Sequence, residues 1–256
     1  MRLLTAWPVG AAAALALLAG CGDGDGTGAR RPTLVVSAAA SLQEALTACS
    51  RDDPKARIRL SFAGSDELAA QIRQGVKPDV FAAADTKLPQ ALHQEGRLQR
   101  PVVFATNELV LAVPADGARV TSLDDLGGPA VKLVVGSADV PVGAYTRDVL
   151  DRLPADEQQA IRANVRSEEP DVKGVVGKLT QGAADAGFVY ATDVEASSGR
   201  LRAIALPAQL RPVVAYGAGV VRGADEPGAA AEYLRGLVRG GCADALRQAG
   251  FGPPPR

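Results

Sequence analysis

Apolar runs that alternate with amphipathic runs constrain the fold of this chain more than any other feature. From residue 33 to residue 95 the order is strand, helix, strand, helix, strand, helix. The expected strands are Thr33–Ser37, Arg57–Phe62 and Asp79–Ala83, and the expected helices are Leu42–Ser50, Asp66–Gln74 and Lys87–Glu95. This order predicts a parallel sheet with helices packed on its faces.

A long extended stretch, Val102–Val113, then interrupts the alternation. A second series of strands and helices follows it: Val131–Val135, Gly143–Leu153, Ala163–Ser167, Asp171–Gln181 and Ala186–Tyr190. Two further strands are expected at Leu201–Leu206 and Val213–Val221, and two closing helices at Glu226–Arg239 and Cys242–Ala249.

The two extended stretches indicate a chain that leaves its first α/β unit and later returns to it. Val102–Val113 leads out, and a segment near Arg211–Gly219 leads back. The predicted fold is therefore α/β, with two lobes of mixed, mainly parallel sheets, two crossover strands and a ligand cleft between the lobes. We expect residues 32–106 and 217–256 to form lobe 1, and residues 107–216 to form lobe 2.

The first twenty residues have the pattern of a lipoprotein signal peptide. Arg2 precedes the apolar run Ala11–Leu18, which is shorter than the roughly 20 residues of a membrane-spanning helix. The run ends in Leu-Ala-Gly-Cys21, which resembles a lipobox, and Gly/Asp-rich residues follow. We expect residues 1–20 to be removed, Cys21 to carry lipid and residues 21–31 to form a flexible tether. A buried N-terminal helix with an incidental cysteine is the alternative.

Composition excludes several classes of function. The formal net charge is −1, and no basic run with interleaved aromatic residues is present, so we expect no nucleic-acid partner. The only histidine in the sequence is His93, which lies in a predicted helix. One histidine and two remaining cysteines are too few to form a His/Cys metal site. Cys49 and Cys242 would remain after processing, and they fit either a disulfide or two separate buried thiols.

Catalytic motifs are also missing from the sequence. No serine lies in a G-x-S-x-G elbow, a Ser-His-Asp triad would have to use His93, and Ser41 is followed three residues later by Glu44 rather than by lysine. No nucleotide-binding glycine motif occurs. The carboxylate pairs Glu168-Glu169 and Asp124-Asp125 fit solvated faces or helix caps. We therefore expect that the protein is not an enzyme, has no catalytic residue, and binds neither a cofactor nor a bare metal ion.

Two serines follow the first two predicted strands. Ser41 and Glu44 form a Ser-x-x-Glu capping box, and Ser65 stands after Gly64 at the start of the next helix. Each serine by itself is explained as a helix cap. Together they would present two hydroxyls and free backbone N–H groups at one edge of the sheet, which is a ready site for an anion.

The second series supplies matching groups. Pro141-Val142-Gly143 and Pro170-Asp171-Val172 each begin a predicted helix, where proline leaves the following N–H groups free to point outward. Tyr190 ends a strand and adds a phenolic hydroxyl, although a half-buried strand aromatic is the simpler reading. Neutral donors of this kind can replace the hydration shell of an oxyanion.

With these residues in place, the chain resembles the periplasmic molybdate-binding proteins of ABC transporters, which have the type II periplasmic-binding-protein fold. The resemblance covers roughly residues 33–250. It rests on four stretches: VVSAAASLQEAL, SFAGSDELAAQIRQGVKPDVFAAAD, VPVGAYTRDVL and VRSEEPDVKGVVGKLTQGAADAGFVYATD.

The resemblance implies a tetrahedral oxyanion held between the lobes by serine hydroxyls, backbone amides and a tyrosine. Carried over motif by motif, the ligand-binding residues are Ser41, Ser65, Val142, Val172 and Tyr190. Asp66 departs from the pattern, because the family often has Ser or Thr there. We expect its carboxylate to face away from the anion.

The leading hypothesis is an extracytoplasmic, lipid-anchored, monomeric receptor in the cell envelope. It would bind molybdate, and also tungstate, and deliver the oxyanion to the permease of an ABC-type importer. A receptor for sulfate or another tetrahedral oxyanion on the same fold is the alternative. A serine hydrolase using Ser41 or Ser65 is the third hypothesis.

Overall fold

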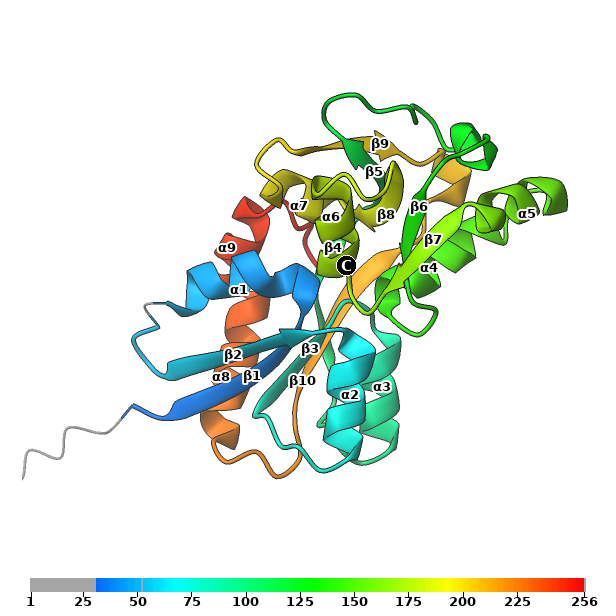
Figure 1. Ribbon diagram of the computed structural model, residues 1–256. Coiled ribbons are helices and arrows are strands. Elements are labelled where there is room, and N and C mark those ends of the chain that lie inside the picture. The colour runs from blue at the N-terminus through cyan, green and yellow to red at the C-terminus, as the bar shows by residue number, and fades with distance from the viewer. Residues whose placement is uncertain (1–30, 52, 256) are drawn as a thin grey trace, which may run out of the picture. The chain divides into compact units, whose positions relative to one another are not determined.

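Two five-stranded mixed sheets form the framework of residues 31–51 and 53–255, the part of the chain that the computed structural model describes (Figure 1). The first sheet contains β1 (Thr33–Ala39), β2 (Arg57–Ala63), β3 (Val80–Ala83), β4 (Val102–Asn107) and β10 (Val214–Val220). The second contains β5 (Leu109–Pro114), β6 (Leu133–Gly136), β7 (Val165–Glu169), β8 (Ala186–Tyr190) and β9 (Leu201–Ala205). The predicted signal peptide, Cys21 and all of the tether except Arg31 lie outside the described residues.

The two sheets share one pattern of strand directions. Their orders are β2-β1-β3-β10-β4 and β7-β6-β8-β5-β9. In each sheet the fourth strand in this order, β10 or β5, runs antiparallel to both neighbours, and the other strands run in one direction. The predicted fold class is confirmed, including the mainly parallel character of both sheets.

Helices cover both faces of the first sheet. They are α1 (Gln43–Ser50), α2 (Ser65–Arg73), α3 (Lys87–Gln94), α8 (Pro227–Val238) and α9 (Gly241–Gln248). Side chains alternate along a strand, so Phe81 and Ala83 join Leu68 of α2 and Leu92 of α3 in one apolar cluster. Val80 and Ala82 belong to the larger cluster, which also includes residues of α1, α8 and α9.

The second sheet carries α4 (Pro141–Leu150), α5 (Ala155–Ala163), α6 (Val172–Thr180) and α7 (Ala191–Ala196), and 3₁₀ turns form η1 (Ala40–Leu42), η2 (Asp124–Gly127) and η3 (Ala208–Leu210). The sequence pattern predicted neither α5 nor α7, and it predicted that the helix before α5 extends to Leu153. Pro154 separates α4 from α5, and Asp156 and Glu157 lie in the first turn of α5. These are ordinary signals of a helix start.

The two crossovers lie where extended segments were predicted. Val102–Val113 is two strands rather than one, because β4 pairs within the first sheet, Glu108 is the break, and β5 pairs within the second. The return runs from β9 through η3 to β10, which inserts between β3 and β4. The division of the chain into lobes at 106/107 and 216/217 stays a prediction.

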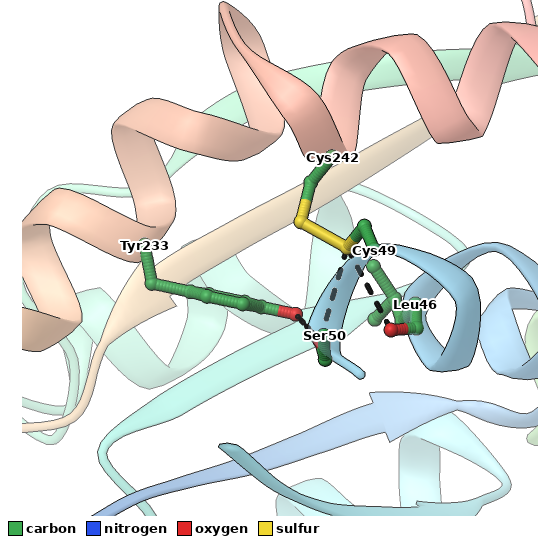
Figure 2. The surroundings of a disulfide bond; sticks show 5 residues. All are labelled: Leu46, Cys49, Ser50, Tyr233 and Cys242. Atoms are coloured by element: carbon green, nitrogen blue, oxygen red, sulfur yellow. Dashed lines mark hydrogen bonds between the residues drawn. A yellow bond between two sulfur atoms is a disulfide. The ribbon is translucent and has the colours of Figure 1, made fainter. Parts of the chain in front are cut away.

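A disulfide between Cys49 and Cys242 joins α1 to α9, as Figure 2 shows. The sequence left this pairing open. The Cα atoms are 4.9 Å apart and the cysteines are separated by 193 residues along the chain. Beside the bridge, the hydroxyls of Ser50 and Tyr233 are 3.2 Å apart and hydrogen-bonded.

Among the described residues, no helix is both long enough and apolar enough to cross a membrane.

Removal of this disulfide should destabilise the protein substantially. A cross-link that closes so long a loop restricts the unfolded chain, so Cys242→Ser should lower the free energy of unfolding by about 2–4 kcal/mol. Chemical denaturation with and without a reducing agent measures the difference. The reductant should shift the wild type and leave Cys242→Ser unchanged, whereas an unshifted wild type would contradict the prediction.

Candidate functional site

A small cavity between the two sheets brings together all five predicted site residues. Its lining comes from the ends of β1, β2, β3 and β8 and from the starts of α2, α4 and α6. The lining residues are Ala39, Ala40, Ser41, Ala63, Gly64, Ser65, Ala84, Val140, Pro141, Val142, Asp171, Val172 and Tyr190. The volume of this cavity is only about 20 Å³. In this arrangement the cavity suits a very small ligand and excludes a nucleotide, a sugar or a peptide.

Three helix N-termini point their first turns at the cavity. Ser65 is the first residue of α2, Val142 the second of α4 and Val172 the first of α6. N–H groups in the first turn have no partner within the helix, and the helix dipole adds partial positive charge there. No lysine or arginine is among the lining residues. The hydrogen-bond donors that the described cavity offers to an anion are therefore neutral.

Ser41 is not the helix cap that its Ser-x-x-Glu motif predicted. The chain forms the 3₁₀ turn η1 at Ala40–Leu42, so α1 begins at Gln43 and Ser41 lies two residues before it. The Ser41 hydroxyl instead bonds with the hydroxyl of Tyr216, at 3.0 Å. Glu44 also has another partner, because its carboxylate binds Lys173. The capping-box prediction is wrong.

Ser65 is not a cap either. Gly64 occupies the N-cap position, and the Ser65 hydroxyl accepts a hydrogen bond from the backbone N–H of Ala84 at 3.1 Å. Ser65 is buried, with 1% of its surface exposed. Because its oxygen accepts from Ala84, its own proton remains available for donation into the cavity.

Gly64 lies against the other lobe. A Cβ placed on this residue would come within 2.6 Å of the carbonyl oxygen of Pro170, which precedes α6. Its backbone is in an ordinary region, with φ −57° and ψ 138°, so conformational freedom is not what glycine supplies here. The absent side chain allows the two lobes to approach each other beside the cavity.

Tyr190 is buried, with 1% of its surface exposed, and lines the cavity. Within residues 31–51 and 53–255, its hydroxyl has no hydrogen-bond partner. Burial raises the pKa of Tyr190 well above its usual value, so the phenol stays protonated. A buried hydroxyl without a partner costs free energy, and a ligand that accepts its proton would remove that cost.

Asp66 is not among the residues that line the cavity. Its Oδ1 is buried and has no hydrogen-bond partner in the described part of the chain. This oxygen lies on the side of Gly64, where a Cβ on Gly64 would come within 2.7 Å of it. That the Asp66 carboxylate faces away from a bound anion stays a prediction.

An ion-pair network that the sequence analysis missed spans the two lobes beside the cavity. Lys173 of α6 contacts the two carboxylate oxygens of Glu44 in α1 at 3.0 and 2.9 Å, and Oδ1 of Asp193 at 3.0 Å. Burial raises the pKa of Asp193 to about 6, although Lys173 acts in the opposite direction. Burial lowers the pKa of Lys173, but the two carboxylates outweigh it and the net shift is upward.

This network touches the site at two points. Lys173 directly follows Val172, and the Asp193 carboxylate accepts a hydrogen bond from the backbone N–H of Tyr190 at 3.3 Å. Its members are far apart in sequence, so neither periodicity nor spacing could reveal it. The described residues contain no cluster of His, Cys, Asp and Glu side chains suited to a metal ion.

Comparison with known proteins agrees with this architecture. Residues 34–252 match the family of bacterial extracellular solute-binding proteins. The chain is 34% identical over 233 residues to the molybdate-binding protein ModA of Mycobacterium tuberculosis, covering 89% of this chain and 86% of that protein. It is 31% identical over 172 residues to the putative ABC transporter substrate-binding lipoprotein YvgL of Bacillus subtilis, covering 64% of this chain and 65% of that protein.

A solved structure shows the same fold. The periplasmic molybdate-binding protein of Azotobacter vinelandii superposes with a TM-score of 0.77 at 21% sequence identity. The match covers 87% of this chain and 100% of the other. At this identity the likeness concerns the arrangement of helices and strands.

Proposed function

Because the chain belongs to the family of bacterial extracellular solute-binding proteins, we propose that it is a receptor for molybdate, and also tungstate, that delivers the oxyanion to an ABC-type importer. Family membership confirms that the chain is a transport receptor and not an enzyme. It also confirms that the chain works outside the cytoplasm. The identity to ModA proteins over most of the chain supports molybdate as the ligand.

One observation carries the proposal: neutral donors from both lobes surround one cavity, and among the described residues no cationic side chain lines it. In the proposed complex the donors are the hydroxyls of Ser41, Ser65 and Tyr190 and the backbone amides of Val142 and Val172. A fully deprotonated tetrahedral oxyanion has only acceptors to offer, so it matches a set of donors. No further cofactor enters the proposal.

Donors from both lobes also couple binding to the approach of the lobes. An anion held by Ser41 and Ser65 on one side and by Val142 and Val172 on the other favours the arrangement in which Gly64 meets Pro170. The pair Glu44–Lys173 adds a contact across the same boundary. In this proposal the lobes close over the anion and replace its hydration shell.

We further propose that the receptor is a monomer attached to the membrane through lipid on Cys21, where it meets the permease of its importer. The sequence Leu-Ala-Gly-Cys21 supports the anchor, and so does the likeness to the lipoprotein YvgL. The lobe boundaries at residues 106/107 and 216/217 belong to the same proposal.

Titration should identify the ligand. Isothermal titration calorimetry of the folded protein should show molybdate and tungstate binding with dissociation constants below 1 mM, which corresponds to at least about 4 kcal/mol of binding free energy. Sulfate and phosphate should compete weakly. A folded protein that binds neither molybdate nor tungstate would contradict the proposal, and tighter binding of sulfate would identify a sulfate receptor instead.

Gly64→Ala should weaken molybdate binding by roughly 10- to 100-fold, because overpacking costs about 1–3 kcal/mol and the added methyl group meets Pro170 when the lobes approach. The ligand-free protein should lose less, because separation of the lobes relieves the contact with Pro170 and leaves only the contact with the end of the Asp66 side chain. Gly228→Ala in α8 is a matched control, since nothing lies within 4 Å of a Cβ there. Equal affinity in Gly64→Ala and Gly228→Ala would show that the contact with Pro170 does not limit binding.

Cys21→Ser should release the protein from membranes into the soluble fraction of the cells that express it, because the lipid attachment point is lost. Fractionation followed by immunoblotting measures the distribution, with the wild type as the control. An unchanged membrane fraction in Cys21→Ser would rule out the proposed anchor.

A further inference from the structure

A short series of hydrogen bonds leads from the crossover strand β4 to the Ser41 hydroxyl. Asn107 is the last residue of β4, and its Nδ2 donates to the Tyr216 hydroxyl at 3.3 Å and to Thr192 Oγ1 at 2.9 Å. Tyr216 lies in β10, is fully buried and bonds with Ser41 at 3.0 Å. These residues join both crossover strands to one wall of the cavity.

The orientation of the Asn107 amide is fixed by the backbone next to it. The N–H of Glu108 bonds with Asn107 Oδ1 at 2.9 Å, and a backbone N–H can only donate. The carbonyl oxygen of the amide must therefore face Glu108. The amide nitrogen must then face Tyr216 and Thr192, to which it can only donate.

The direction of each proton follows from this orientation. Burial raises the pKa of Tyr216, so its hydroxyl keeps its single proton. The Asn107 nitrogen cannot accept that proton, so of the two groups bonded to the Tyr216 hydroxyl only the Ser41 oxygen can accept it. The Ser41 oxygen then accepts, and the proton of Ser41 has no role in this bond. Ser41 lines the cavity, so its hydroxyl can donate there.

We propose that Asn107 and Tyr216 are positioning residues that turn the Ser41 hydroxyl into an obligate donor toward the cavity. This inference rests on the proposed oxyanion-binding function. Without the series of bonds, the Ser41 proton could point to Tyr216 and leave an oxygen lone pair facing the anion. With the series of bonds in place, the Ser41 lone pair cannot face the anion. The Ser41 hydroxyl is then already oriented before the ligand binds, so binding costs less conformational entropy.

The Tyr216 ring can be kept while its hydroxyl is removed. The ring makes edge contacts with Phe104, Tyr190 and Phe251, with centroids 6.1, 5.9 and 5.3 Å away. Tyr216→Phe preserves these contacts and removes only the bonds to Ser41 and Asn107. Tyr233→Phe is a matched control, because Tyr233 is also buried and also bonds with a serine hydroxyl, that of Ser50 beside the disulfide.

A double-mutant cycle separates positioning from a general structural role. Molybdate affinity is measured by calorimetry for the wild type, Ser41→Ala, Tyr216→Phe and the double variant. In the presence of Ser41, Tyr216→Phe should weaken binding about 5- to 20-fold, a typical effect of one hydrogen bond. In the Ser41→Ala background it should weaken binding less than about 2-fold, because the group it orients is gone. Tyr233→Phe should leave affinity unchanged.

Asn107→Asp is the second variant and keeps the test valid if Tyr216→Phe does not fold. Its carboxylate accepts from Tyr216 and draws the proton of Ser41 away from the cavity, so molybdate affinity should fall further than in Tyr216→Phe. Asn107→Asp also repels the anion through its charge. In the Ser41→Ala background only this repulsion should remain, so Asn107→Asp should reduce molybdate affinity less there than in the presence of Ser41. Equal losses with and without Ser41, or no loss, would overturn the positioning role and leave the receptor function intact. A wild type that binds no oxyanion would overturn both.

Discussion

The cost of taking an anion out of water, with no cation beside it, is the constraint on which the proposed site depends. A buried charge is tolerated only when its lone pairs meet donors. One helix start cannot surround a tetrahedral ion, so donors have to converge from several directions. Ser41 and Ser65 follow strands of the first sheet, Val142 and Val172 follow strands of the second, and Tyr190 ends a strand of the second. The two sheets and the crossovers between them are what bring these groups together.

Small residues allow the backbone itself to form the site. Alanines at Ala39, Ala40, Ala63 and Ala84 line the cavity, so main-chain groups come close to its interior. Gly143 illustrates the same requirement at the start of α4, since a Cβ there would come within 1.9 Å of the carbonyl oxygen of Ser137. The ion pairs of Lys173 with Glu44 and Asp193 lie next to these groups, because Lys173 directly follows Val172 in α6.

The alternation of strands and helices predicts this fold, and the strand ends and helix starts predict hydroxyls and free amides at one edge. The choice of Val142 and Val172 among those amides came from the resemblance to a known family. Sequence reasoning was wrong about Ser41 and Ser65 as caps, because a 3₁₀ turn and Gly64 take those positions. It could not find the partners of Ser41, since Tyr216 lies 175 residues away and only the insertion of β10 brings it near. The chain has only four tyrosines, and this scarcity drew attention to Tyr190 but not to Tyr216.

The position of β10 in the first sheet also bears on when the molecule becomes competent during its biogenesis. β1 and α1 form early in the chain, yet Ser41 needs Tyr216 from β10, and α1 is fastened to α9 by the disulfide with Cys242. A nascent chain that lacks its last fifty residues therefore lacks the completed wall around Ser41. The disulfide adds the same requirement, because it needs Cys242 near the end of the chain and persists in an oxidising compartment. The segment around Ser41 therefore gains its last hydrogen-bonded and covalent partners only when the whole chain is present.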